Sequence, residues 1–254
     1  MRPYLRLVLL LPLFAAGAVR VAADADTLVK EALAAEAGLD SRHALELFLA
    51  AARERPDDAF IVQKIARQYS DLMLDLADDG EKKRYARIAL EYSQRAVRLD
   101  PTNPVNVLSL AICHGKLALY SDTRTKIQYS RLVREEAERA LALDPNNAWA
   151  HHVLGRWNYE VASLGTATRL VLRLVYGGLP DASCAAAIEH LARAVELEPD
   201  EPAHRLELGF AYLAAGERAK ARTEFAKGLA VPSRAKQDES AKQRAREALA
   251  RLDS

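Results

Sequence analysis

Small and apolar residues recur at fixed distances before four prolines of the chain, Pro56, Pro101, Pro145 and Pro199. The residues twelve, eight and five positions before each proline are mostly alanine or another small or apolar residue: Ala44, Phe48 and Ala51; Ala89, Ser93 and Ala96; Val133, Ala137 and Ala140; Ala187, Leu191 and Ala194. These offsets share one face of an α-helix, and the residue before a proline is pushed out of the helical region. The pattern predicts four helices that end at the prolines and pack closely through this face.

A partner helix follows each proline, and the last unit shows the pairing best. Leu208 and Gly209 stand where Leu154 and Gly155 stand one unit earlier. The last unit resembles the tetratricopeptide repeat, with Gly216 in its turn, at the positions Leu208, Gly209, Tyr212, Ala221 and Phe225. A regular repeat of this kind has about 34 residues, whereas successive prolines lie 45, 44 and 54 residues apart. The units must therefore carry lengthened helices or insertions.

The remaining segments complete the stack. Residues 25–37 and 41–55 form an opening helix pair, and residues 59–77 and 105–121 are expected as long first helices. The largest excess, residues 162–181, is expected to hold an extra helix over 166–176 and a loop. Residues 234–252 are charged and alanine-bearing, as expected of a helix that seals the end of a stack. The sequence thus predicts an all-α, tetratricopeptide-like α-solenoid of about five helix pairs with lengthened helices and a C-terminal capping helix.

Composition supports a helical, soluble domain and disfavours a nucleic-acid binder. Half of the residues are apolar, 28% are charged and only 6% are aromatic. Alanine, leucine, glutamate and arginine favour helices. The 36 lysines and arginines are balanced by 35 acidic residues, so no field of one sign attracts a polyanion. We therefore expect no nucleic-acid partner.

The first residues have the order of a secretory signal peptide. Arg2 and Arg6 precede an apolar run over 7–19, and small residues follow up to Ala25. We expect a signal peptide over 1–25 that is cleaved near 23–25, leaving the repeat domain over 26–254 in an exported, periplasmic protein. A bilayer needs about 20 apolar residues, so an uncleaved membrane anchor is the weaker alternative. A mitochondrial transit peptide is a further alternative.

The two cysteines leave two interpretations open. Cys113 and Cys184 each lie in an apolar helical stretch. One interpretation is that both are small side chains buried in the core. The other is that, in an oxidising compartment, they form a disulfide that closes a long loop. The sequence cannot show whether their Cβ atoms meet.

Several short sequence motifs, mostly in the middle of the chain, resemble those of the regulator of microtubule dynamics family. They are Thr125-Lys126-Ile127 through Glu136, Ala140 to Pro145, His152 to Trp157 with Tyr159, Ala89 to Tyr92 with Arg95 to Val97, and Arg169 to Pro180 before Ala186 to Pro199. The resemblance covers roughly residues 45–252. It implies a helical repeat domain that works as a non-catalytic adaptor, with eukaryotic members linked to microtubules and to mitochondrial or endoplasmic-reticulum membranes, and lipid binding proposed for some. An export signal departs from that setting, so in a bacterial periplasm only the scaffold is carried over.

No convergent catalytic set is found, and we expect no enzyme, no cofactor and no metal. The chain lacks a His-Glu-x-x-His helix, a glycine-rich phosphate loop before a lysine and a Gly-x-Ser-x-Gly elbow. His151 and His152 point about 100° apart on a helix, which spoils a shared metal face. Cys113 and His114 diverge in the same way.

Binding is the stronger expectation, because stacked helix pairs form a curved solenoid lined by their first helices. The second, fifth, ninth and twelfth positions after each proline-marked turn are expected to face the inner curve. They include a predicted partner-binding groove of Phe60, Gln63, Arg67, Trp149, His152, Arg156, Tyr159 and Phe210. Aromatic surface beside arginine and histidine suits a peptide carboxylate or an acidic lipid head group. If the insertion folds into the groove instead, Trp149 and Tyr159 become part of the core, and both alternatives stay open.

The insertion itself offers a second contact. Arg169 and Arg173 lie four residues apart among apolar residues, so a short helix there is a candidate for lipid or peripheral membrane contact, although such a helix is more often buried. The sequence thus predicts a non-catalytic scaffold that holds a protein or peptide partner in the groove. The alternative is a lipid or small-amphiphile carrier that uses the same groove.

Overall fold

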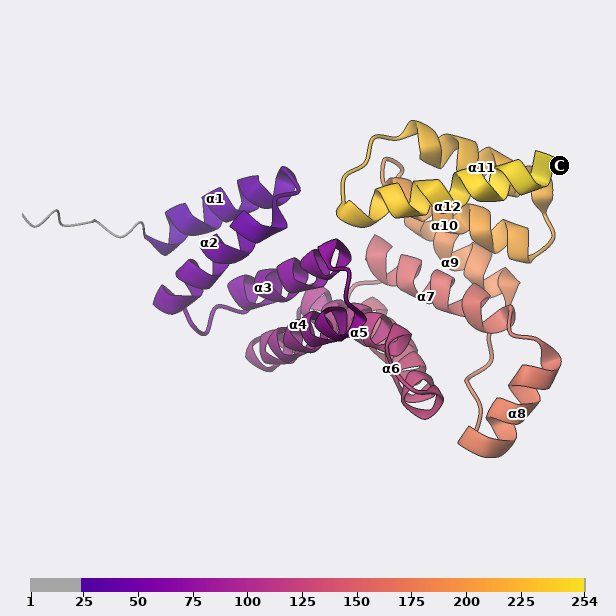
Figure 1. Ribbon diagram of the computed structural model, residues 1–254, viewed down its shortest axis with the longest axis horizontal. Helices are drawn as coiled ribbons and strands as arrows, with labels where there is room; N and C mark the ends of the chain where they lie inside the picture. Colours follow the sequence, from indigo (N-terminus) through magenta and orange to yellow (C-terminus); the bar gives the residue numbers. More distant parts are fainter. Residues whose placement is uncertain (1–23, 254) are drawn as a thin grey trace, which may run out of the picture.

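The computed structural model describes residues 24–253, and every regular element in this range is helical (Figure 1). The elements are α1 (Ala25–Ala37), α2 (Ser41–Glu54), α3 (Ala59–Leu72), the 3-10 helix η1 (Met73–Asp75), α4 (Asp79–Leu99), α5 (Pro104–Leu119), α6 (Thr123–Leu143), α7 (Ala148–Ala162), α8 (Thr166–Tyr176), α9 (Cys184–Leu197), α10 (Pro202–Ala214), α11 (Arg218–Ala230) and α12 (Lys236–Asp253). The predicted signal peptide over 1–25 lies almost wholly outside the described residues.

The helix ends follow from the sequence. The four helices α2, α4, α6 and α9 each stop two residues before one of the marker prolines. The first helices that follow begin at polar caps, because Asp58, Asn103 and Asn147 each accept a hydrogen bond from a backbone N–H of the first turn. Each unit boundary is therefore a proline turn followed by a capped helix start.

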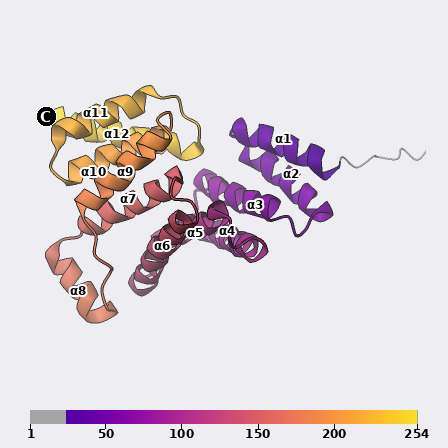
Figure 2. The same cartoon turned by 180° about the vertical axis from the view of Figure 1, so that it is seen from behind.

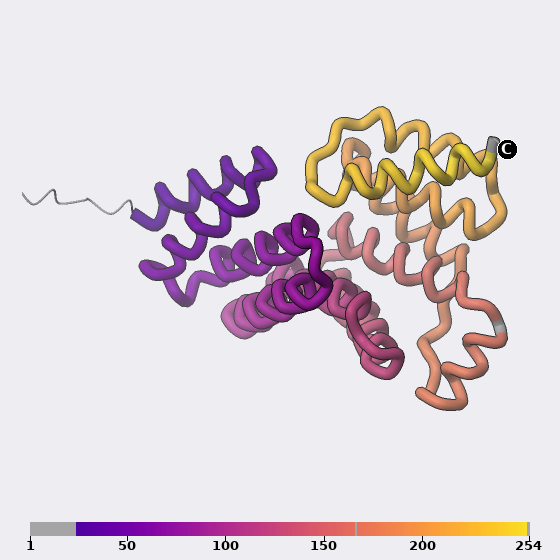
Figure 3. The backbone as a smooth tube through the Cα atoms, in the orientation of Figure 1, coloured from indigo at the N-terminus to yellow at the C-terminus, as the bar shows by residue number. Residues whose placement is uncertain are grey.

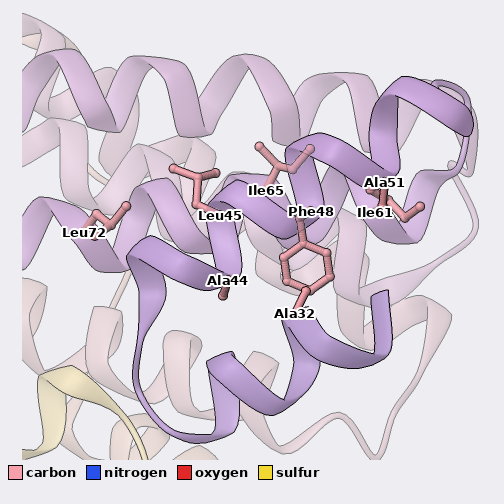
Figure 4. Packing of buried hydrophobic residues seen from close by; sticks show 8 residues of the cluster. All are labelled: Ala32, Ala44, Leu45, Phe48, Ala51, Ile61, Ile65 and Leu72. Atoms are coloured by element: carbon pink, nitrogen blue, oxygen red, sulfur yellow. The ribbon is translucent and has the colours of Figure 1, made fainter. Parts of the chain in front are cut away.

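The twelve residues of the predicted narrow face are all buried, with at most 9% of their surface exposed for eleven apolar members and none for Ser93. Figure 4 shows the first unit, in which Phe48 and Ala51 of α2 lie against Ile61 and Ile65 of α3. Fully burying a phenylalanine or isoleucine side chain contributes about 1.5–3 kcal/mol. The proline-phased pattern is thus the core of the solenoid.

The helices pair as α1 with α2, α3 with α4, α5 with α6, α7 with α9, and α10 with α11, and α12 covers the last pair (Figures 1 and 3). This confirms the five pairs and the capping helix. The helix α8 is the predicted extra helix of the insertion. None of the helices in residues 24–253 has the length and apolar character that crossing a bilayer requires.

The extra length of the units lies elsewhere than expected. The helix predicted over 59–77 ends at Leu72, and the chain continues in η1. The second helices α4 and α6 are the long ones, with 21 residues each. Asp78 and Asp122 cap them, each accepting a hydrogen bond from a backbone N–H of the first turn. The helix expected over 105–121 is close to the observed α5, so in these units the extra residues lengthen mainly the second helices.

The stack bends into an arc, with α1 and α2 at one end and α10 to α12 at the other (Figure 2). The first helices α3, α5, α7 and α10 contact one another in succession, which places them on the inner side of the bend. An ion pair between Asp75 of η1 and Lys236 at the start of α12 joins distant parts of the chain. The second helix pair and the capping helix are therefore linked across the arc.

Candidate functional site

The register of the first helices determines which inner residues are accessible. The ninth position is at least partly exposed in all four units: Arg67, Ile112, Arg156 and Phe210. The fifth position is buried in all four: Gln63, Leu108, His152 and Leu206. The expectation that Gln63 and His152 face the groove is therefore corrected. Neighbouring first helices touch on the inside of the bend, and the fifth position is enclosed between them.

The predicted residues of α7 meet a charged centre on α10 that the sequence did not reveal. The carboxylate of Glu207 is 3% exposed and accepts hydrogen bonds from the Tyr159 hydroxyl at 2.6 Å and from Arg244 of α12 at 2.6 Å. The Arg156 guanidinium lies 3.9 Å away and is also bonded to Glu160 of its own helix at 2.8 Å. Three helices thus converge on one buried carboxylate.

The electrostatics keep this centre charged. Burial alone would raise the pKa of Glu207, but Arg156 and Arg244 outweigh it and hold the pKa below its ordinary value. Glu207 in turn raises the pKa of Arg156. Burial, followed by the Glu207 charge, raises the pKa of Tyr159, so its hydroxyl stays a proton donor. The arrangement is a permanent ion cluster rather than an acid–base pair.

A pair of buried histidines lies beside the cluster. The Nδ1 atoms of His152 and His204 are 3.0 Å apart, and the Trp149 ring packs against both imidazoles with centroids 5.0 and 4.8 Å away. Burial lowers the pKa of His152 to about 4 and that of His204 to about 2. One Nδ1 must donate and the other accept, and because both pKa values lie well below 7, both rings are neutral at pH 7.

A pocket of about 430 Å³ adjoins the cluster between α10, α11 and α12. Its lining residues are Phe210, Leu213, Arg218, Arg244, Glu247, Ala248, Arg251 and Leu252. Arg244 joins the pocket to the buried carboxylate, because its guanidinium bonds Glu207 and also lies 4.8 Å from the centroid of the Phe210 ring. The pocket combines an apolar floor with arginines, a mixture that suits an apolar group carrying a negative charge.

The N-terminal part of the inner side is a second polar network. Glu36 of α1 accepts hydrogen bonds from Lys64 and Gln68 and lies 3.3 Å from Arg67. Arg67 keeps about half of its side chain exposed, and Phe60, two turns earlier on the same face of α3, is 47% exposed. The predicted residues Phe60 and Arg67 are therefore accessible, but they lie on another unit than the Glu207 cluster.

The next first helix adds a half-buried lysine to this network. Lys116 of α5 donates to the backbone carbonyl of Ser70 at 2.7 Å. Burial lowers the pKa of Lys116 and raises that of Asp71. The inner side is thus lined with charge between its apolar positions.

The insertion does not cover the α7 residues of the predicted groove. Its loop residues Leu179 and Ala182 pack against Trp157 and neighbouring side chains, and α8 lies at the outer edge of the molecule (Figures 1 and 2). Trp149 and Tyr159 are half-buried by His152, His204 and Glu207 instead. Of the two insertion arginines, Arg173 is exposed and Arg169 is half-buried.

Candidate chemistry elsewhere in residues 24–253 is sparse. No group of three or more histidine, cysteine or acidic side chains in this range is placed to hold a metal ion. Cys113 is a buried free thiol 3.4 Å from the Ser93 hydroxyl, and Cys184 is a free thiol at the start of α9. His114 bonds Glu136 at 2.8 Å rather than Cys113. The two cysteines are therefore unpaired here.

Comparison with known proteins identifies what the chain is similar to. The sequence model of the family described as Regulator of microtubule dynamics protein 1-3 matches residues 22–253. Regulator of microtubule dynamics protein 3 of Xenopus laevis is 27% identical over 136 residues, which cover 54% of this chain and 29% of that protein. Protein 1 of Mus musculus is 25% identical over 184 residues, covering 72% of this chain and 60% of that protein. The chain thus spans less than two thirds of the length of either relative.

Solved structures show the same fold. TTC0263, a thermophilic TPR protein of Thermus thermophilus, matches with a TM-score of 0.65 and 23% identity over 89% of this chain and 99% of that one. A monomeric mutant of IFIT1 matches with a TM-score of 0.53 and 21% identity over 91% of this chain and 55% of that one. Both likenesses support the tetratricopeptide-type solenoid.

Proposed function

The chain belongs to the regulator of microtubule dynamics family, and from this premise we propose that it is a non-catalytic adaptor that holds a peptide segment of a protein partner along the inner side of its helical repeat. The names of the relatives refer to microtubule dynamics; we carry over only a scaffold role and not an action on microtubules. The observation that carries the proposal is the register of the first helices. Their ninth positions stay accessible from unit to unit and lead to the pocket beside Arg244.

The chemistry of this surface defines the segment that it fits. Arg156 and Arg244 each keep nearly half of their side chain exposed although Glu207 holds them in place. Fixed arginines recognise a carboxylate with little loss of side-chain entropy. Phe210 and Leu213 offer an apolar surface next to them. We therefore propose a peptide that places an acidic group at the arginines and an apolar side chain in the pocket.

Photo-crosslinking tests the proposal. A benzoylphenylalanine at position 213 is introduced into the full chain in its native host, and adducts are identified by mass spectrometry. Arg156→Gln should reduce the protein adduct several-fold, because it removes one of the two charge-assisted contacts. Arg84→Gln is the matched control, since Arg84 also bonds an acidic residue of its own helix but lies on the outer helix α4. Equal adducts from both variants would contradict the proposal.

The same pocket supports one second candidate, a carrier of lipid or another small amphiphile. An apolar floor with an arginine rim is also the chemistry of a site for an acidic head group. Lipid extraction from the purified protein distinguishes the two. A stoichiometric bound lipid whose loss follows Leu213→Glu would favour the carrier, whereas a protein adduct at position 213 with no bound lipid favours the adaptor.

We also propose that the leader directs export to a periplasm, with removal after Ala23. The side chain of Asp24 accepts a hydrogen bond from the Thr27 backbone N–H at 2.8 Å and so caps α1. Cleavage after Ala23 keeps this cap, whereas cleavage after Ala25 removes it together with the first residue of the helix. N-terminal sequencing of the protein from its host should therefore begin at Asp24. A start at Met1 would contradict removal.

A further inference from the structure

The helix α8 presents an apolar face that no other part of the described chain covers. Leu170, Val171, Leu174 and Val175 are 57%, 54%, 75% and 62% exposed. Single exposed apolar residues are common on proteins, but four on one short helix form a continuous patch. At about 100° per residue these four side chains span about 140° of the helix circumference, so they form a stripe along the C-terminal part of the helix.

The outward orientation of this face is fixed by specific contacts. Arg131 of α6 donates to the backbone carbonyls of Tyr176 at 2.7 Å and Gly178 at 2.6 Å. Gly177 is in the left-handed conformation, and the Gly178 N–H returns to the Leu172 carbonyl, which closes the helix end. At the other flank, Arg169 donates to the carbonyl of Ala182. The helix is therefore clamped from one side, and its apolar face points away from the protein.

The charge around the stripe identifies what it fits. Residues 161–180 contain Arg169 and Arg173 and no acidic residue. Arg173 is exposed and lies about 60° from Leu170 around the helix, which places a cation at the border of the stripe. An apolar stripe with cations at its border is the arrangement of helices that lie in the head-group region of anionic bilayers. A second copy of this face would supply no acidic side chain to pair with either arginine.

We propose that α8 docks the protein on an anionic membrane surface, with Leu170, Val171, Leu174 and Val175 inserted among the lipids and Arg173 at the head groups. The site lies at the outer edge of the molecule, away from α12 and the pocket (Figures 1 and 2). Docking therefore leaves the inner side of the arc open to a partner. A repeat domain held by this helix presents its binding surface at a membrane.

Vesicle co-sedimentation of the full chain tests the proposal. Vesicles of phosphatidylcholine with phosphatidylglycerol should bind the protein more tightly than phosphatidylcholine alone, and added salt should weaken this binding. Leu174→Glu should lower the affinity about tenfold or more, and Arg173→Glu at least about fivefold. Because the apolar run of residues 7–19 is common to all chains compared, the differences between variants isolate the contribution of α8.

Matched controls exclude general effects of these substitutions. Leu119→Glu replaces a leucine of α5 that is 66% exposed, and Arg87→Glu reverses an exposed arginine of α4. Both should bind vesicles like the unaltered chain. Circular dichroism of all four variants should be unchanged, since the replaced side chains are exposed.

Three results would overturn the proposal. The first is equal vesicle binding by Leu174→Glu and Leu119→Glu. The second is equal binding to both kinds of vesicle. The third is a dimer without lipid that Leu174→Glu turns into a monomer, because the stripe would then be covered by a second copy.

Discussion

A Cβ atom built on Gly209 would lie 2.5 Å from two ring carbons of Phe225. The helices α10 and α11 are therefore in contact through the backbone of one and the aromatic ring of the other. Gly155 is in the same relation to Leu191, 2.5 Å from its Cγ, in the unit before. The two Leu-Gly pairs of the sequence thus mark equivalent contacts. At both glycines the two helices come closer together than any residue with a Cβ atom would allow.

Gly209→Leu tests this contact. We expect a loss of about 1–3 kcal/mol in the free energy of unfolding, because the ring of Phe225 must be displaced. Gly115→Ala is the control, since its nearest neighbour would be a Val133 methyl at an ordinary 3.7 Å. That variant should be unchanged or more stable by about 1 kcal/mol, as expected for alanine in place of glycine in a helix. Urea unfolding measures both, and equal stabilities would contradict the assigned contact.

The sequence predicted the solenoid because its packing is local and periodic. The narrow face before each proline is visible as three residues within eight positions, for example Ala187, Leu191 and Ala194. Their burial depends only on the helix period and on the neighbouring helix in the chain. The same reasoning placed the helix over 105–121 correctly but extended the one over 59–77 past its end at Leu72, because the apolar pattern continues through Met73 and Leu74 although the chain changes to a 3-10 turn there.

The Glu207 cluster could not be predicted in this way. Its members Tyr159, Glu207 and Arg244 come from three helices that are far apart in the sequence, and nothing local marks Glu207 as buried. One signal was present, since a glutamate among Leu206, Leu208 and the following glycine sits in an otherwise apolar stretch. A buried carboxylate needs cationic partners, but the sequence does not show which arginines reach it.

The paired histidines predict a pH dependence of stability. Since the folded pKa values of His152 and His204 lie at about 4 and 2, below the unfolded value of about 6.5, the unfolded chain binds more protons as the pH falls. The pair's contribution to the free energy of unfolding should therefore be greatest above pH 6.5. It should decrease by a few kcal/mol between about pH 6.5 and 4. Glu207, with its lowered pKa, adds a further loss only below its ordinary value of 4.5.

Variants separate the histidine pair from other titrating groups. His204→Gln keeps a hydrogen-bonding group but cannot be protonated, so the decrease of stability between about pH 6.5 and 5 should become smaller. His43→Gln changes an exposed histidine and should leave the slope as it is. Urea unfolding at several pH values provides the measurement. The pair plays no part if His204→Gln and the unaltered chain show the same slope.

The cysteines should behave as two thiols of different reactivity. Burial raises the pKa of Cys113 to about 11, so its thiolate is scarce at neutral pH, and the folded chain also hides the sulfur. Cys184 is only half-buried. A thiol reagent should therefore modify Cys184 quickly and Cys113 slowly in the folded chain. In denaturant both cysteines should react at similar rates. Cys113→Ser and Cys184→Ser assign the phases, and a denatured chain that reacts only after reduction would reveal a disulfide.

The cluster around Glu207 predicts a link between the binding surface and the capping helix. Glu207→Gln removes the charge that holds Arg244 of α12 and Arg156 of α7, and the loss of charge-assisted bonds to a buried group should cost about 1–3 kcal/mol in stability. Glu160→Gln is the matched control, because Glu160 bonds the same Arg156 but is half-exposed. Its effect should stay within about 1 kcal/mol.

Hydrogen exchange locates the effect of Glu207→Gln. Amide protection should fall most strongly in α12, since the Arg244–Glu207 bond ties this helix to α10. A fall spread evenly over all helices would contradict the link. If the prediction is correct, a ligand that pulls Arg244 away from Glu207 also loosens α12, so occupation of the pocket and the hold of the capping helix are coupled through one arginine.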